Sequence, residues 1–160
     1  MNILFVTRLY SGFEKSLYKK VWQPEGVPTI YNLFNKLSLS HNLSILFTAK
    51  DSGATYTSNW NESKDIELRL KNLNADIKVL CGNKYFFSFI PRKLAMIMRD
   101  VRQFLKVVFY VAKMRPDIVY CDSANVVIAY LLTKLFPSKP IIVRVLGICS
   151  FWRSITNSKR

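Results

Sequence analysis

The chain has 160 residues, of which 50% are hydrophobic and 14% aromatic, and its formal net charge is +14. This length and composition are typical of one globular domain with a sizeable core, and they exclude a disordered chain. The three cysteines (Cys81, Cys121 and Cys149) are far apart and form no CxxC pair. That spacing argues against a disulfide framework or a zinc site and favours a reducing compartment.

The first residues lack a basic region, and their apolar run is too short for a signal peptide, so we expect a cytoplasmic protein. The charge favours acidic partners, namely anionic lipid headgroups, nucleic acid or phosphorylated substrates. An acidic second half that is missing from this chain would also balance it.

In chain order, Ile3 to Thr7 is a continuous apolar run that predicts a buried parallel strand. The polar segment from Arg8 to Glu25 follows, and we expect a long functional loop there. A helix from Val27 to Ser38 comes next, with Pro28 in its first turn. Leu43 to Thr48 is a second strand, and residues 50–64 are polar and predict a loop.

Residues Ile66 to Leu73 are compatible with a strand or a short helix, and the pattern does not decide between them. The remaining predicted elements are a strand at Ile77–Leu80, a helix from Pro91 or Arg92 to Met114, a strand at Ile118–Cys121, a helix at Ala124–Phe136 and a strand at Ile141–Val145. This alternation predicts an α/β fold, a Rossmann-like doubly wound parallel sheet with about five core strands. The domain spans residues 1–147, and residues 148–160 are an incomplete continuation or tail.

Polar residues and glycines follow the predicted strands, at the edge where such sheets bind ligands. Asp122 comes directly after the Ile118 strand, and it either contacts a hydroxylated substrate or caps the next helix. Gly26 precedes the first helix and Gly147 follows the last strand. Each permits close approach of a ligand to the backbone or simply forms a turn.

The long predicted helix carries two stripes of side chains. Its apolar stripe is Leu94, Ile97, Val101, Leu105, Val108 and Ala112, and its basic stripe is Arg92, Arg99, Lys106 and Lys113, with Arg102 beside them. Cationic residues near aromatic ones suit an anionic membrane surface. The alternative is a solvated face of a helix packed on a sheet. Charges interrupt the apolar run too often for a transmembrane span.

No dinucleotide or phosphate-binding glycine motif, metalloprotease motif, nucleophile elbow or catalytic dyad is visible, and we expect no metal and no cofactor. No nucleic-acid-binding motif accompanies the charge, so nucleic acid is not an expected partner.

Five segments in order carry a resemblance to a known family. They are Asn2-Ile-Leu-Phe-Val-Thr-Arg, Pro24-Glu-Gly-Val-Pro-Thr-Ile, Ser40-His-Asn-Leu-Ser-Ile-Leu-Phe-Thr, Arg115-Pro-Asp-Ile-Val-Tyr-Cys-Asp-Ser and Lys139-Pro-Ile-Ile-Val-Arg-Val-Leu-Gly. The chain resembles the amino-terminal domain of GT-B glycosyltransferases of family 4. The family often has Gly-Gly where this chain has Glu25-Gly26, and His-Gly where it has Leu146-Gly147.

The resemblance implies one half of a GT-B architecture, which holds the acceptor while a second domain binds a nucleotide-sugar. Gly26 and Gly147 would line the cleft, with Asp122, Asn125 and Arg144 on the acceptor side. The acceptor would be lipid-linked or a polysaccharide at the inner face of the plasma membrane, and this chain alone would be inactive. Two alternatives are a noncatalytic module for membrane docking or acceptor presentation, and a basic nucleic-acid-binding α/β domain.

Overall fold

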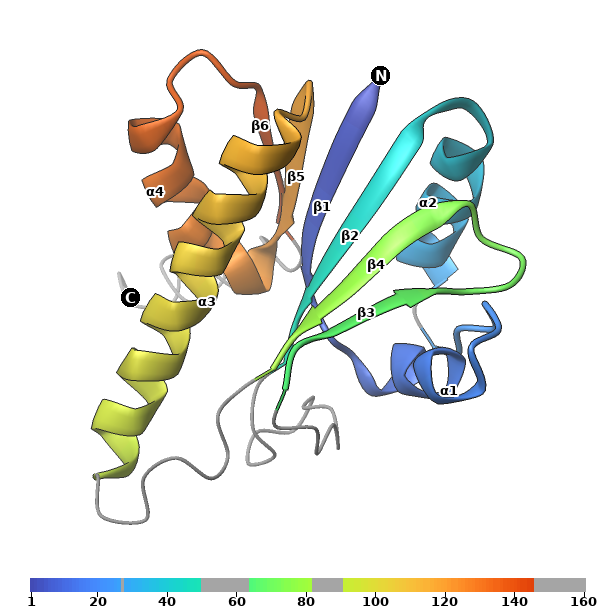
Figure 1. Ribbon diagram of the computed structural model, residues 1–160, viewed down its shortest axis with the longest axis horizontal. Coiled ribbons are helices and arrows are strands. Elements are labelled where there is room, and N and C mark those ends of the chain that lie inside the picture. Colours follow the sequence, from blue (N-terminus) through green and yellow to red (C-terminus); the bar gives the residue numbers. More distant parts are fainter. Residues whose placement is uncertain (27, 50–63, 82–90, 146–160) are drawn as a thin grey trace, which may run out of the picture.

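A computed structural model describes residues 1–26, 28–49, 64–81 and 91–145, without the side chains of Pro28 and Arg92. Its centre is a six-stranded sheet with helices on both faces (Figure 1). The strands are β1 (Asn2–Arg8), β2 (Asn42–Thr48), β3 (Ile66–Arg69), β4 (Ala75–Leu80), β5 (Ile118–Asp122) and β6 (Ile141–Arg144).

The order of the strands across the sheet is β3-β4-β2-β1-β5-β6. Every neighbouring pair is parallel except β3 and β4, which are antiparallel. This arrangement confirms the predicted Rossmann-like α/β class with five parallel strands. The undecided segment that begins at Ile66 forms an antiparallel edge strand beside β4.

The helices are α1 (Ser11–Lys19), α2 (Pro28–Ser40), α3 (Arg92–Met114) and α4 (Val126–Leu135), and a short 3₁₀ turn (Ser123–Asn125) precedes α4. Helix α1 lies where the sequence predicted a loop, so that prediction was wrong. Its only buried apolar side chains are Phe13 and Leu17, too few for a clear periodic signal. Tertiary packing supports this short helix, since Phe13 stacks on Trp22 with ring centroids 5.7 Å apart.

The two faces of the sheet have different cores. Side chains alternate along β1, so Ile3 and Phe5 point to one face and Leu4 and Val6 to the other. The first face packs against α1 and α2 through an aromatic cluster that includes Phe34. The second packs against α3 and α4 through smaller aliphatic residues.

Helix α3 has the predicted bounds, but its apolar stripe is not the face that packs on the sheet. The buried residues of α3 are Arg99, Gln103, Val107 and Val111. Four members of the apolar stripe are exposed instead, namely Leu94, Ile97, Val101 and Leu105. The sheet therefore receives a face of mixed polarity, and a row of large aliphatic side chains remains on the surface.

Candidate functional site

The carboxyl ends of β1 and β5 form the topological switch point of the sheet. These two strands are neighbours, and the chain leaves β1 toward the face covered by α1 and α2, but leaves β5 toward the face covered by α4. In open α/β sheets, ligands bind in the crevice at this point. Arg8 and Asp122, the last residues of the two strands, therefore lie where such a crevice would be.

Asp122 is the centre of a buried hydrogen-bond network, with only 2% of its surface exposed. Its Oδ2 atom accepts hydrogen bonds from the Thr7 hydroxyl at 2.9 Å and from the Arg8 backbone N–H at 2.7 Å. The Tyr10 hydroxyl donates to the same oxygen at 3.4 Å. The other oxygen, Oδ1, accepts from the Asn125 side-chain amide at 2.8 Å. The carboxylate thus joins the ends of β1 and β5.

Asn125 extends the network toward β2. Its Oδ1 atom accepts a hydrogen bond from the Thr48 hydroxyl at 3.2 Å. Asn125 is itself buried, so its amide is fully engaged between two strands. The predicted residues Asp122 and Asn125 therefore lie together, but as partners of each other.

In the structure, Asp122 does not cap the following helix, which was its alternative predicted role. The 3₁₀ turn that follows Asp122 has no side-chain capping hydrogen bond. The prediction of a cap was wrong because the carboxylate turns back to β1, where a hydroxyl and a backbone N–H are available. Helix capping is a local interaction, and here a contact between distant strands replaces it.

Two arginines and a tyrosine surround this network. Arg144 pairs with Asp122 in the register of β5 and β6, and Arg8 lies on the other side of Asp122. Burial raises the pKa of the Tyr10 hydroxyl, and Asp122 raises it further, while the positive charges of Arg8 and Arg144 act in the opposite direction. The three side chains are therefore electrostatic neighbours. Sequence analysis named Arg144 and missed Arg8 and Tyr10, although Arg8 is the first charged side chain of the chain and the last residue of β1.

Gly26 lies in the loop before α2 and has φ = 78°, a left-handed conformation that favours glycine. A Cβ atom at this position would meet no atom within 4 Å, so the space around Gly26 is open. The preceding residue, Glu25, donates its backbone N–H to the Gly12 carbonyl oxygen at 2.9 Å. Its carboxylate pairs with Lys15, and the hydrogen bond from Lys15 lowers the pKa of Glu25. Gly147 lies outside the described residues.

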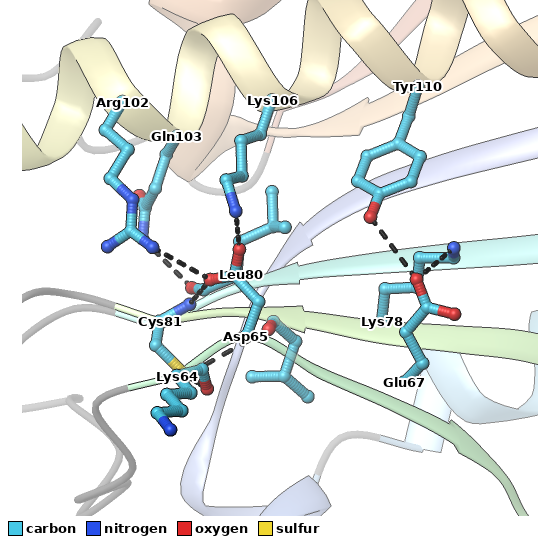
Figure 2. Close-up of polar contacts among 11 residues, drawn as sticks. Lys64, Asp65, Glu67, Lys78, Leu80, Cys81, Arg102, Gln103, Lys106 and Tyr110 are labelled. Atoms are coloured by element: carbon cyan, nitrogen blue, oxygen red, sulfur yellow. Dashed lines mark hydrogen bonds and ion pairs between the residues drawn. The ribbon is translucent and has the colours of Figure 1, made fainter.

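The basic stripe of α3 is mostly occupied by contacts within the protein. Arg99 is only 7% exposed and pairs with Asp100 at 2.9 Å. Arg102 and Lys106 both pair with Asp65, the former at 3.6 Å (Figure 2). Lys113 is exposed, and its ammonium lies 5.8 Å from the centre of the Phe109 ring. The side chain of Arg92 lies outside the described residues.

Further polar contacts fasten α3 to the sheet. Asp65 also accepts the Cys81 backbone N–H at 3.0 Å, and Gln103 donates its amide to backbone carbonyl oxygens at the ends of β2 and β4 (Figure 2). Nearer the carboxyl end of α3, Tyr110 donates to Glu67 at 3.5 Å. These contacts fix the rotation of α3 about its axis and so hold its apolar stripe outward.

Helices α3 and α4 together present a large apolar surface, which we call the α3–α4 surface. Its exposed members are Leu94, Ile97, Val101, Leu105 and Phe109 on α3 and Val127, Tyr130, Leu131 and Leu135 on α4. A groove of about 280 Å³ runs between the two helices. A larger hollow, about 590 Å³, lies at the opposite edge of the sheet around Asn2, Asn42 and Asn74, away from the switch point.

Within the described ranges, none of the helices has both the length and the apolar character needed to cross a bilayer. The same residues contain no group of three or more potential ligands that could hold a metal ion. Comparison of the chain with protein-family models, with curated proteins and with solved structures gives no significant match.

Proposed function

We propose that this chain is the acceptor-side half of a glycosyltransferase that moves a sugar from a nucleotide-sugar to a lipid-linked or polysaccharide acceptor. The observation that supports the proposal is the group of polar residues at the carboxyl ends of β1, β5 and β6, at the switch point of a Rossmann-like sheet. Binding sites of such sheets lie there, and two of the segments that resemble the family, Asn2–Arg8 and residues 115–123, end there.

In the proposed reaction, a hydroxyl oxygen of the acceptor forms a bond to the anomeric carbon of the donor sugar. The bond from that carbon to the nucleoside diphosphate breaks, and the hydroxyl proton is released. Positive groups and helix N-termini stabilise the charge on the leaving diphosphate. On the family resemblance, a separate donor-binding domain supplies most of these groups, so the chain acts with that domain as its partner.

The test is a transfer assay with a radiolabelled nucleotide-sugar and membrane lipid extracts as acceptor. The chain is assayed alone and together with a donor-binding domain of a family 4 enzyme. We expect transfer only when both proteins are present, and none from the donor-binding domain by itself. A chain that gives no transfer with any donor domain, and no retention of lipid-linked or polysaccharide acceptors, would contradict the proposal.

A second candidate function is docking on an anionic membrane, and the α3–α4 surface favours it. Exposed aliphatic and aromatic side chains on neighbouring helices gain free energy when they leave water for the boundary of a bilayer. Lys93, Lys113 and Lys134 lie exposed on the same helices, and the net charge of +14 complements anionic headgroups. Two copies of so basic a chain would repel each other, which favours a lipid surface over self-association.

The proposed docking element differs from the basic stripe predicted from the sequence. Arg99, Arg102 and Lys106 already have carboxylate partners, so the apolar stripe carries the binding and exposed lysines add to it. Docking there would hold the switch point near an acceptor whose lipid is in the membrane.

Co-sedimentation with phosphatidylglycerol vesicles tests the docking function. Ile97 and Leu105 are each 59% exposed, and Leu39, on the opposite side of the sheet, is 87% exposed. Ile97→Asp and Leu105→Asp should each weaken vesicle binding about tenfold or more, since burial of such a side chain contributes about 1.5–3 kcal/mol. Leu39→Asp introduces the same charge elsewhere and should leave binding unchanged. Equal effects of all three substitutions, or dimerisation through Ile97 in sedimentation experiments, would contradict docking.

A further inference from the structure

Among the described residues, the switch point holds two arginines, Arg8 and Arg144, and one carboxylate, Asp122. Neither Arg8 nor Arg144 takes part in an ion pair there. The Nε atom of Arg8 is buried and has no hydrogen-bond partner. A desolvated guanidinium donor without an acceptor is costly, and in native proteins such groups normally have a partner.

Asp122 carries a negative charge at this edge, but neither guanidinium forms an ion pair with it. Its Oδ2 atom already accepts from Thr7, Arg8 and Tyr10, and its Oδ1 atom from Asn125. The Arg8 contact comes from the backbone N–H, so the guanidinium gains nothing from it. The edge therefore has two guanidinium groups and one carboxylate, so among these three residues the positive charge exceeds the negative charge by one.

The two arginines reach the same edge from opposite faces of the sheet. Arg144 is in register with Asp122, whereas Arg8 is one residue beyond the β1 position level with Asp122, so the two side chains leave the sheet on opposite faces. β5 lies between β1 and β6, so the two backbones are about 10 Å apart, and a ligand shared by both arginines must lie above the ends of the strands. Both positive charges act on the Tyr10 hydroxyl, which lies at the same edge through its hydrogen bond to Asp122. Arginine side chains are long enough to reach a group bound between them, and their planar forks match phosphate oxygens.

We propose that Arg8 and Arg144 form a subsite for a phosphate or diphosphate ester above the carboxyl ends of β1, β5 and β6, with Tyr10 beside it. This proposal rests on the proposed function in one respect only, because that function supplies two natural sources of the group. One is the diphosphate of a lipid-linked acceptor, and the other is the diphosphate of the nucleotide-sugar. In both cases the arginines bind and orient the anion, while the Asp122 network holds the ends of the strands in place.

The test is isothermal titration calorimetry of the chain with inorganic diphosphate, farnesyl diphosphate and uridine diphosphate. We expect saturable binding of diphosphate, and a dissociation constant about tenfold or more higher in Arg8→Gln and in Arg144→Gln. Lys139→Gln is the matched control. It also removes one positive charge, but Lys139 lies just before the amino end of β6, whereas Arg144 lies at its carboxyl end. It should change the dissociation constant by less than about twofold.

Arg8→Lys and Arg144→Lys keep the charge but not the fork, and they should bind with intermediate affinity. Because the lysine variants keep the positive charge, they also test whether the neutral glutamine variants lose binding only because the fold is disturbed. Circular dichroism checks the fold of every variant. Tighter binding of farnesyl diphosphate would identify the acceptor lipid as the source, and tighter binding of uridine diphosphate would identify the donor. An equal loss in Lys139→Gln, or no saturable binding of any probe, would overturn the subsite.

The outcome is separable from that of the transfer assay. Diphosphate binding that depends on both arginines would support the subsite even if no sugar transfer is found. Conversely, sugar transfer that is insensitive to Arg8→Gln and Arg144→Gln would leave the proposed function standing and remove this subsite.

Discussion

Gln103 on α3 donates its side-chain amide to the carbonyl oxygen of Ala49, just beyond the end of β2, at 2.7 Å. The same amide nitrogen lies 3.1 Å from the carbonyl oxygen of Leu80 at the end of β4. Gln103 is buried, and a buried amide is tolerated only where it is hydrogen-bonded. These two bonds explain how α3 can turn a face containing a glutamine toward the sheet and leave its aliphatic stripe in solvent.

Replacing Gln103 by methionine tests this attachment. We expect the free energy of unfolding to fall by about 1–3 kcal/mol, because buried carbonyl oxygens lose a donor while the volume of the side chain is nearly kept. Urea denaturation followed by circular dichroism measures the change. Lys93→Met, on an exposed part of the same helix, should change the stability by less than about 0.5 kcal/mol. Equal stabilities of the two variants would show that the hydrogen bonds of Gln103 contribute little.

The Asp122 network predicts a large effect of a small substitution. Asp122→Asn replaces an acceptor of four hydrogen bonds by an amide, whose N–H₂ group cannot accept from Thr7 or Arg8. We expect a loss of about 2–3 kcal/mol in the free energy of unfolding. Asp117→Asn is the matched control at the opposite end of β5, where an exposed carboxylate accepts one hydrogen bond from the Asn2 backbone N–H at 2.7 Å. A loss at Asp122 no larger than that at Asp117 would contradict a structural role for the network.

The five parallel strands were predictable because they are apolar runs that fill both faces of a parallel sheet, whereas the segment that forms the antiparallel β3 was left undecided. The prediction from Ile118 onward placed β5 correctly and put Asp122 at the carboxyl edge of the sheet. The contacts of Asp122 were not predictable, because Thr7 and Arg8 lie more than 100 residues away in sequence. The local sequence predicts that Asp122 caps a helix. Its carboxylate instead accepts hydrogen bonds from Thr7 and Arg8, which lie close to it only because β1 and β5 pair in parallel.

The orientation of α3 is the other feature that the sequence concealed. Its aliphatic residues have the period of a buried helical face, and nothing in that period reveals that Gln103 finds buried carbonyl partners. The acidic partner of Arg102 and Lys106, Asp65, precedes β3 and is far away in sequence. A basic stripe that pairs with a distant carboxylate has the same sequence pattern as one that faces a membrane.

Two glycines near the start of α1 and α2 should respond differently to substitution. A Cβ atom on Gly12 would lie 1.7 Å from the Glu25 carbonyl oxygen, so Gly12→Ala must displace the backbone before α2. We expect it to lower the free energy of unfolding by about 1–3 kcal/mol in urea denaturation. A variant as stable as the native chain would mean that this loop moves aside without cost.

Gly26 has open space around it, so its substitution tests the site rather than the packing. Gly26→Asn tolerates the left-handed backbone and should keep the free energy of unfolding within about 1 kcal/mol. It places a side chain where we propose that a substrate approaches, and sugar transfer with the donor-binding domain should fall about tenfold or more. Gly26→Val should lower transfer at least as much. Undiminished transfer in both variants would remove Gly26 from the site.

The thiol of Cys121 predicts how stability depends on alkaline pH. Burial, with a smaller contribution from Asp122, raises the pKa of Cys121 from its ordinary value of 9.0 to about 12. Between these values the unfolded chain releases this proton and the folded chain keeps it, so the free energy of unfolding falls as the pH rises. The slope from one such group approaches about 1.4 kcal/mol per pH unit. Burial also raises the pKa values of Tyr10 and Tyr120, which steepens the fall above pH 10.

Urea denaturation of the native chain and of Cys121→Ala between pH 8 and pH 11 isolates the thiol. The alanine variant should be less stable at pH 8 because it leaves a small cavity, but its slope between pH 9 and pH 10 should be shallower, so the difference between the two proteins should shrink as the pH rises. The tyrosines are unchanged in the variant, so their contribution cancels in the difference between the two curves. Parallel curves across that interval would mean that the Cys121 thiol ionises equally in the folded and the unfolded chain, which its buried place between β1 and β6 argues against.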